Sequence, residues 1–402
     1  MTLSHQQPHL ETEAMNRLRR RWGAVALLYS LVWWLTYQLL QSTMHATFAD
    51  RWRLFSAALA LLLLGFLWRG LRYNRRTEAS HLWPTLGYGN WLSLLRGIVL
   101  CLLAGFFLLP RPTVALTWLP ALLYTADRVT DLFDGYLARR TGRVSKLGAM
   151  LDIELDGLGL LIAVVLGVQY GLLPVWYLLL AVSRQLFVMG LWLRRRAGLP
   201  NRDLPPSDNR RVIAGFQTGF LCVVFWPLLT PAVTQWAAVL FAIPLIYSFG
   251  RDWLVVSYVI DPESALYRKT RSVIKLCFER YLPVLARGMC VGLMVWFLWP
   301  FGDAATPWSA TVHRWQLPYV SLWSGLLWGI FAVATVATLL GIAGRLAALC
   351  LLGFVLLLIG GQGIITPGSG LLLSSTITVA HLGAGNWSLW QPEEIWLHTQ
   401  YG

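Results

Sequence analysis

Long apolar segments alternate with short polar ones along almost the whole chain. A run of about 17 to 25 apolar residues is long enough to cross a bilayer as an α-helix. Such segments occupy residues 23–40, 54–70, 91–109, 114–137, 152–172, 174–193, 212–229, 235–257, 282–299, 318–340 and 343–360, with a weaker one at 368–385. The pattern predicts an all-α, polytopic integral membrane protein.

The composition agrees with this prediction. Of the 402 residues, 56% are hydrophobic, 13% are charged and 22 are tryptophan, which is typical of a membrane protein and not of a soluble domain. A polar segment that ends in an arginine-rich cluster at residues 17–21 precedes the first apolar run. No cleavable signal peptide is therefore expected, and the cluster predicts a cytoplasmic N-terminus.

Lysine and arginine gather in alternate loops, as the positive-inside rule requires. The loops expected in the cytoplasm hold Arg69, Arg72, Arg75, Arg76, Arg139, Arg140, Arg143, Lys146, Arg194, Arg195, Arg196, Arg202, Arg210, Arg211, Arg268, Lys269, Arg271, Lys275 and Arg280, whereas the loops expected outside hold only Arg51, Arg53, Arg111 and Arg314. Orientation and attraction to anionic headgroups explain the net charge of +14, so nucleic-acid binding is not expected. We expect a multi-pass protein of a bacterial inner (cytoplasmic) membrane.

Four aspartates stand within 26 residues, namely Asp131, Asp134, Asp152 and Asp156. Carboxylates at membrane depth are costly unless they pair, bind ions or carry chemistry. Offsets of three and four place each pair on one face of a helix, and two antiparallel helices joined by the loop 140–147 would bring the four together. Carboxylate oxygens suit hard divalent ions. The spacing therefore predicts a metal site that faces the cytoplasm.

The same stretch resembles the signature of the CDP-alcohol phosphotransferase family, which is DxxDGxxAR, eight residues and GxxxDxxxD. All eight specified positions match, in Asp131, Asp134, Gly135, Ala138, Arg139, Gly148, Asp152 and Asp156. Upstream, residues 90–96 (NWLSLLR) resemble the family's NxLTxxR stretch, with Ser93 in place of threonine. Downstream, Arg211 and Gln217 fall near a lysine and a glutamine that many members carry. The resemblance covers residues 85–257.

The resemblance implies a metal-dependent phosphotransferase of phospholipid biosynthesis. Two divalent cations, Mg²⁺ or Mn²⁺, would be held by Asp131, Asp134 and Asp152, with Asp156 completing the site and accepting the proton of the acceptor hydroxyl as the catalytic base. The CDP moiety would lie against Asp131, Gly135, Ala138, Arg139 and Gly148. The donor would be CDP-diacylglycerol, and the products would be CMP and a phosphodiester lipid. The resemblance also implies a homodimer.

The acceptor alcohol depends on residues outside the signature. Arg184 stands alone in the apolar segment 174–193, where an arginine is expected to face a polar interior. It and Arg211 are candidates for binding an acceptor phosphate or carboxylate. Basic residues at the cytoplasmic mouth favour a small anionic acceptor, with glycerol 3-phosphate as the first choice.

Three regions are expected along the chain. Residues 1–84 would form a cytoplasmic segment with two transmembrane helices, residues 85–260 the six-helix catalytic core, and residues 261–402 an accessory bundle of three to four transmembrane helices. The segment 341–349 in the last region is similar to DoxX-like four-helix membrane proteins. An accessory bundle that packs on the core or mediates assembly is the other interpretation.

Other functions remain open at this point. A soluble CDP-alcohol could donate to a lipid acceptor in place of CDP-diacylglycerol. A membrane cation transporter would also carry carboxylates in helices, but near the midplane or between repeated halves, whereas these cluster at one end and no repeat is visible. A non-catalytic scaffold is expected to lose at least one aspartate, and none is lost.

Overall fold

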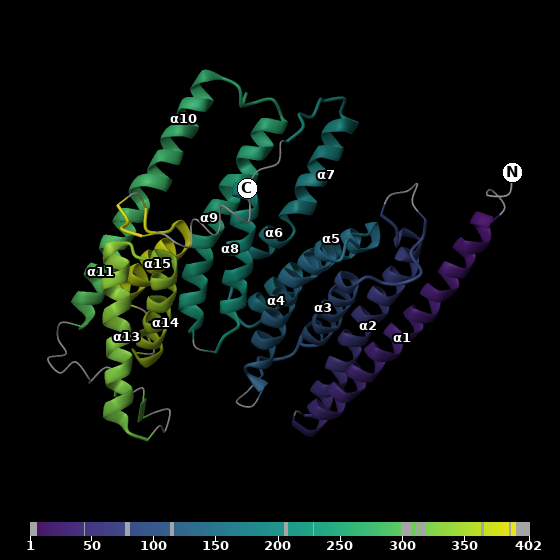
Figure 1. Cartoon of the computed structure of the whole chain (residues 1–402), viewed down its shortest axis with the longest axis horizontal. Coiled ribbons are helices and arrows are strands. Elements are labelled where there is room, and N and C mark those ends of the chain that lie inside the picture. The colour runs from purple at the N-terminus through teal and green to yellow at the C-terminus, as the bar shows by residue number, and fades with distance from the viewer. Residues whose placement is uncertain are drawn as a thin grey trace. The chain divides into compact units, whose positions relative to one another are not determined.

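The structure is a computed structural model that describes residues 6–43, 45–76, 81–112, 116–204, 208–227, 229–298, 308–309, 312–313, 318–362, 366–385 and 387–390. The chain divides into two compact units, Met1–Pro227 with Thr234–Trp253, and Leu228–Val233 with Leu254–Gly402. No β-strand occurs within the described ranges, where an isolated bridge joins Ile342 and Trp390. The protein is therefore built from helices (Figure 1).

The first unit contains the helices from α1 to α8 and most of α9. Their bounds are α1 Gln6–Thr43, α2 Ala46–Gly70, α3 Tyr88–Ala104, α4 Leu119–Arg140, α5 Lys146–Gln169, α6 Tyr177–Ala181, α7 Ser183–Arg196, α8 Asp208–Val224 and α9 Pro231–Val256, with a short 3₁₀ turn at Leu71–Tyr73. α4 and α5 correspond to the predicted spans 114–137 and 152–172, each displaced toward the loop between them. The two aspartate pairs therefore lie on the helices where the sequence predicts them.

α3 is the central helix of this unit, because it contacts α1, α2, α4 and α5. Two long side chains tie the N-terminal helices to it: Tyr29 Oη of α1 donates to the Leu94 carbonyl at 2.8 Å, and Trp52 Nε1 of α2 donates to the Leu102 carbonyl at 3.0 Å. A buried donor without such a partner would be costly where no water is present. The helices that precede residue 85 thus help to position α3.

The predicted span 174–193 is interrupted in the structure. α6 ends at Ala181 and α7 begins at Ser183. The Ser183 hydroxyl donates to the Leu180 carbonyl at 2.7 Å, and side-chain bonds of this kind compete with the helical ladder. The prediction of one continuous span was wrong here, and Arg184 lies in the first turn of a separate helix.

Among the described residues, four helices are long and apolar enough to cross a membrane. They are Glu11–Thr43, Ala46–Tyr73, Pro231–Val256 and Val320–Leu340, and shorter apolar helices lie at Tyr88–Ala104, Ile213–Val224, Leu282–Trp296 and Gly344–Ile359. α4 and α5 are outside both sets, since they carry the charged residues of the candidate site. The prediction of an all-α, polytopic membrane protein is confirmed, with fewer helices of full spanning length than the predicted segments.

The second unit contains α10 Ala265–Leu276, a π-helical turn Cys277–Tyr281, α11 Leu282–Leu298, α13 Val320–Leu340, α14 Gly344–Gln362 and α15 Pro367–Leu382. α15 contacts α11 and α14, and α13 contacts the same two helices. Trp308, Phe331 and Phe354 form an aromatic cluster in their core. The DoxX-like resemblance and the accessory role of this unit stay predictions.

Candidate active site

The loop between α4 and α5 is short because α4 ends, and α5 begins, at a strong capping signal. Gly142 has φ +64°, and its N–H donates to the Arg139 carbonyl at 3.1 Å while the Arg143 N–H donates to the Ala138 carbonyl at 3.0 Å. This pair of bonds is a Schellman motif, which favours glycine at the left-handed position. Three residues later, the Ser145 side chain caps α5 by accepting from the Gly148 N–H at 2.9 Å. The chain therefore turns back sharply and sets the two aspartate pairs face to face.

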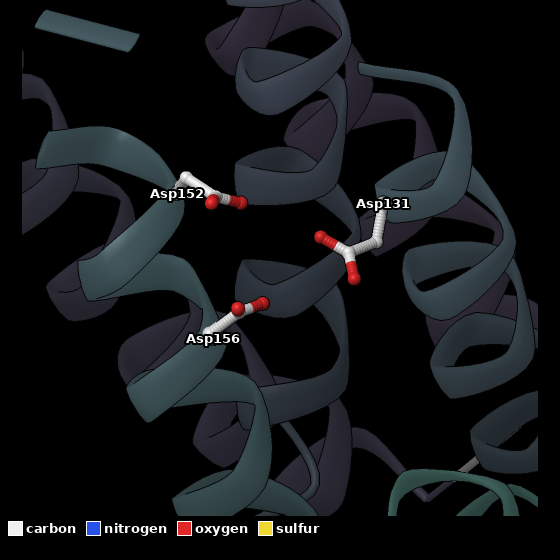
Figure 2. Close-up of side chains that lie close together, drawn as sticks. All are labelled: Asp131, Asp152 and Asp156. Carbon is white, nitrogen blue, oxygen red and sulfur yellow. The ribbon is translucent and has the colours of Figure 1, made fainter. Parts of the chain in front are cut away.

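Three of the four signature aspartates meet between these helices. Carboxylate oxygens of Asp131, Asp152 and Asp156 all lie within 4.8 Å of one another. Figure 2 shows Asp131 pointing from one helix toward Asp152 and Asp156 on the other. The side chains of Asp152 and Asp156 are 49% and 46% exposed, so a ligand can reach them. We call these three residues the aspartate triad.

Asp134 is placed differently from the aspartate triad. Its buried carboxylate accepts a hydrogen bond from Ser93 Oγ at 3.0 Å and one from Arg96 Nη1 at 3.1 Å, both from α3. The serine that replaces the usual threonine therefore still provides a hydroxyl to this aspartate. Sequence spacing places Asp134 on the correct face, but its carboxylate is turned toward α3.

Arg96 is the main basic residue of the site. Its side chain is fully buried, and its guanidinium makes ion pairs with Asp127 (3.4 Å), Asp131 (2.6 Å), Asp134 (3.1 Å), Asp152 (3.1 Å) and Asp156 (2.6 Å). Arg96 belongs to the NxLTxxR-like stretch, but it was not predicted to have a role at this site. An arginine inside the apolar segment 91–109 was the available signal, because such a residue needs polar partners at membrane depth.

Asp127 and Arg128 of α4 are the other residues that sequence reasoning missed. Asp127 is fully buried and pairs with Arg128 at 2.5 Å, and Arg128 Nη1 lies 3.2 Å from Asp156. Asp127 precedes Asp131 by four residues and therefore shares its helix face. That spacing was a signal for a fifth carboxylate at the site.

The small residues of the signature make close helix contacts. A methyl group added at Gly148 would lie 2.6 Å from Asn90 Oδ1, so Gly148 lets α5 approach α3. A methyl group added at Gly89 of α3 would lie 2.9 Å from the Ala138 Cβ, so Ala138 is part of the α3–α4 contact. Packing by itself is therefore enough to require small side chains at these positions.

Asn90 is itself fixed by a polar network. Its Nδ2 donates to Asn74 Oδ1 at 3.2 Å and to Ser145 Oγ at 3.3 Å. Asn74 Nδ2 in turn donates to the Trp83 and Thr85 carbonyls at 2.9 and 3.1 Å. The network holds together the segment after α2, the start of α3 and the cap of α5.

The remaining predicted site residues lie at the edge of this arrangement. Arg139 is exposed, and a methyl group added at Gly135 would lie 3.2 Å from its Nη1, so the Arg139 side chain extends over Gly135. Arg184 is exposed in the first turn of α7. Arg211 belongs to α8, and its side chain lies outside the described residues. Within the described part of the chain, Arg184 makes no ion pair with the aspartate triad.

The charge balance of the site favours cations. Asp127 and the four signature aspartates face two guanidinium groups, those of Arg96 and Arg128, so acidic groups outnumber basic ones by three. One organic cation, Arg96, already lies among the carboxylates. Hard oxygen ligands on two facing helices fit a divalent cation such as Mg²⁺ or Mn²⁺. Such a site can polarise and bind phosphate oxygens.

Comparisons with known proteins point to the same region. Residues 87–246 match the family described as CDP-alcohol phosphatidyltransferase. The chain is similar to a CDP-diacylglycerol–glycerol-3-phosphate 3-phosphatidyltransferase of Cereibacter sphaeroides (42% identity over 77 residues, 18% of this chain and 35% of the relative) and to one of Bacillus subtilis (37% over 73 residues, 18% and 38%). It is also similar to a putative cardiolipin synthase of Mycobacterium tuberculosis (31% over 144 residues, 34% and 66%). No solved structure shows a significant match.

The match is confined to part of each protein. The chain covers 35% and 38% of the first two relatives. The five aspartates, Arg96 and Arg128 all fall inside the matched residues. Residues 87–246 are a CDP-alcohol phosphatidyltransferase domain.

Proposed function

We propose that the protein transfers a phosphatidyl group from CDP-diacylglycerol to a small hydroxyl acceptor and releases CMP. Glycerol 3-phosphate is the first choice of acceptor. The observation that carries the proposal is the aspartate triad, three carboxylates within 4.8 Å on two facing helices inside the matched domain. Two of the similar proteins are named for transfer between these two substrates.

The residues that would hold Mg²⁺ or Mn²⁺ are Asp131, Asp152 and Asp156, with Asp134 beside them. When two such ions are bound, they neutralise the pyrophosphate and stabilise both the attacked and the leaving phosphate. Asp134 accepts its bonds from Ser93 and Arg96 on Oδ2, so it would need to exchange these bonds or to present Oδ1 to become a ligand. Otherwise Asp134 stays bound to Ser93 and Arg96 and orients the Arg96 guanidinium.

The reaction is a displacement at phosphorus. The acceptor hydroxyl oxygen forms a bond to the phosphorus that carries the diacylglycerol, and the bond from that phosphorus to the CMP oxygen breaks. The electron pair of the broken bond leaves with CMP. Asp156, whose side chain is half-exposed at the site, accepts the proton of the hydroxyl.

Substrate contacts follow from the positions around the aspartate triad. Asp131, Gly135 and Arg139 line the face of α4 that we assign to the CDP moiety. Ala138 and Gly148 keep that assignment from the family, although their packing against Gly89 and Asn90 gives them a structural role as well. Arg184 and Arg211 are kept as acceptor-binding candidates on the strength of their charge.

We place the protein in a bacterial inner membrane with the site facing the cytoplasm. The support is the alternation of basic loops, because Arg139, Arg140, Arg143 and Lys146 flank the α4–α5 turn. A cytoplasmic site is open to a soluble acceptor and to a lipid donor from the bilayer. A homodimer, implied by the family resemblance, is part of the same proposal.

A lipid acceptor is the second candidate. It is favoured by the relative named as a putative cardiolipin synthase, of which the chain covers 66%. A soluble CDP-alcohol donor, a cation transporter and a non-catalytic scaffold stay open as alternatives that the assay below separates.

The test is CMP release by purified protein in mixed micelles. CDP-diacylglycerol and Mg²⁺ are supplied with glycerol 3-phosphate, inositol phosphate, serine or phosphatidylglycerol in turn. We expect release that depends on one acceptor and on metal, and that Asp152→Asn lowers by more than about 100-fold because a metal ligand is lost. Asp50→Asn is the matched control, since Asp50 is an exposed aspartate of α2.

Two outcomes would contradict the proposal. One is the absence of CMP release with every acceptor in protein shown to be folded. The other is release by Asp152→Asn at the wild-type rate. Release from a soluble CDP-alcohol with a diacylglycerol acceptor would instead assign the reverse arrangement.

A further inference from the structure

Asp127 and Arg128 are neighbours of the aspartate triad on α4, and neither belongs to the eight signature positions. Asp127 is fully buried, and its carboxylate contacts two guanidinium groups: Arg96 Nε at 3.4 Å and Arg128 Nη2 at 2.5 Å. Arg128 Nε also donates to Asp127 Oδ2 at 2.7 Å. Both Arg128 contacts are to the same oxygen, Oδ2, and the Nε contact is a hydrogen bond, so the guanidinium is held against the Asp127 carboxylate.

The opposite side of that guanidinium reaches the site. Arg128 Nη1 donates to Asp156 Oδ1 at 3.2 Å and lies 4.0 Å from Asp131 Oδ2. The Arg128 side chain is 11% exposed, and its guanidinium lies over the Tyr124 ring at 5.7 Å. Burial of this kind strengthens an ion pair relative to one in water. Arg128 therefore joins a buried carboxylate to the proposed catalytic base.

Gly159 of α5 leaves the space that this pair occupies. A methyl group at Gly159 would lie 2.8 Å from Arg128 Nη2 and 3.2 Å from Asp127 Oδ2. Gly159 follows Asp156 by three residues, so both face α4. The close approach of α5 to the Asp127–Arg128 pair thus depends on the absence of a side chain at this position.

The pair is neutral as a unit, which matters at a site that binds cations. Arg128 alone would reduce the negative charge that holds divalent ions, but Asp127 compensates it at 2.5 Å. The pair can therefore orient Asp156 through a directed hydrogen bond and leave the charge of the aspartate triad available.

We propose that Arg128, held by Asp127 in the space left by Gly159, is a positioning residue that fixes the Asp156 carboxylate for metal binding and for proton acceptance. The proposal rests on the proposed function for the role of Asp156. It assigns no substrate contact to Arg128, which acts through Asp156.

The test measures Mn²⁺ binding and catalysis on the same preparations. Free Mn²⁺ is followed by electron paramagnetic resonance during titration of the detergent-purified full chain, and kcat and KM come from CMP release. The variants are Arg128→Met, Arg128→Lys, Asp127→Asn and Gly159→Ala. The controls are Arg53→Met and Asp50→Asn, which alter an exposed intrahelical pair of α2 with a 3.3 Å contact.

We expect Arg128→Met and Gly159→Ala to weaken Mn²⁺ binding by about 10-fold or more, as loss of a residue that orients a metal ligand does. They are expected to lower kcat with little change in KM for CDP-diacylglycerol. Arg128→Lys is expected to recover part of both losses, because it keeps the charge without the fork. Asp127→Asn is expected to resemble Arg128→Met, and the two α2 controls to resemble wild type.

The proposal is overturned if folded Arg128→Met and Gly159→Ala both keep wild-type Mn²⁺ affinity and kcat. Lower thermal stability with unchanged affinity and kcat would also overturn it, because the pair would then be structural only. If Arg128→Met does not fold, Gly159→Ala decides by the same criteria. Wild-type protein that binds Mn²⁺ but releases no CMP would refute the proposed function, whereas weaker Mn²⁺ binding in the variants would still support the positioning role at the metal site.

Discussion

At the scale of residues, three of the signature carboxylates face one another between α4 and α5, and the fourth, that of Asp134, faces α3. Asp131, Asp152 and Asp156 meet as the spacing predicts. The turn of Asp134 toward Ser93 and Arg96 could not be predicted, because it depends on how α3 packs against α4. Helix periodicity fixes the face on which a side chain lies, but not the neighbour that it bonds to.

A substitution at Gly148 distinguishes a packing role of this residue from a substrate-binding role. Gly148→Ala is expected to destabilise the protein by about 1–3 kcal/mol, because the new methyl group overpacks against Asn90 Oδ1 at 2.6 Å. The cost is expected to fall in an Asn90→Ala background, which a double-mutant cycle on unfolding in detergent measures. Equal stability of Gly148→Ala and wild type would contradict a packing requirement at this position.

At the scale of elements, the end of α4 and the start of α5 were predicted within a few residues. The capping interactions that determine these two ends were not predicted. The predicted loop 140–147 contains both the Gly142 turn and the Ser145 cap. The segment 174–193 was predicted as one span because most of its residues are apolar, although Ser183, Arg184 and Gln185 interrupt the apolar run where α6 ends and α7 begins. Hydropathy detects spans but not interruptions inside them.

The α4–α5 turn makes a prediction of its own. Gly142→Ala is expected to cost about 1–2 kcal/mol, since φ is +64° at this position and a Cβ is strained there. Ser145→Ala is expected to cost about 1 kcal/mol through loss of the cap. Gly23→Ala, in the interior of α1 with nothing within 4 Å of the added Cβ, is the control and is expected not to destabilise. Thermal unfolding in detergent checks all three, and equal changes at Gly142 and Gly23 would contradict the assignment.

At the scale of the whole molecule, composition and the basic loops predicted a helical membrane protein with the site on one side. The structure divides the chain into two units, and α9 contributes residues to both, whereas the three expected regions 1–84, 85–260 and 261–402 stay a prediction. The sequence of the second unit shows no cluster of metal-binding or redox residues from which a function could be argued. Its apolar core of Trp308, Phe331 and Phe354 explains its packing only.

Orientation can be tested on the intact protein. Thr141→Cys, in the α4–α5 turn, is expected to react with a membrane-impermeant maleimide in inverted vesicles and not in right-side-out cells, because we propose that the surrounding basic residues hold this loop in the cytoplasm. His45→Cys, between α1 and α2, is expected to give the opposite result. A Cys277→Ser background removes the exposed native thiol. Labelling of Thr141→Cys from the outer side would contradict the cytoplasmic site.

The most direct test of the central claim is mass spectrometry of the lipid product made from CDP-diacylglycerol and deuterated glycerol 3-phosphate. Wild-type protein with Mg²⁺ is predicted to form a phosphatidyl lipid that carries the deuterated headgroup in equal amount to the CMP released. Removal of Mg²⁺ or the Asp152→Asn substitution is predicted to lower both products by more than about 100-fold, because the first removes the metal and the second removes one of its proposed ligands. CMP released without a deuterated lipid, or a deuterated lipid formed equally well by Asp152→Asn, would contradict metal-assisted transfer at this site.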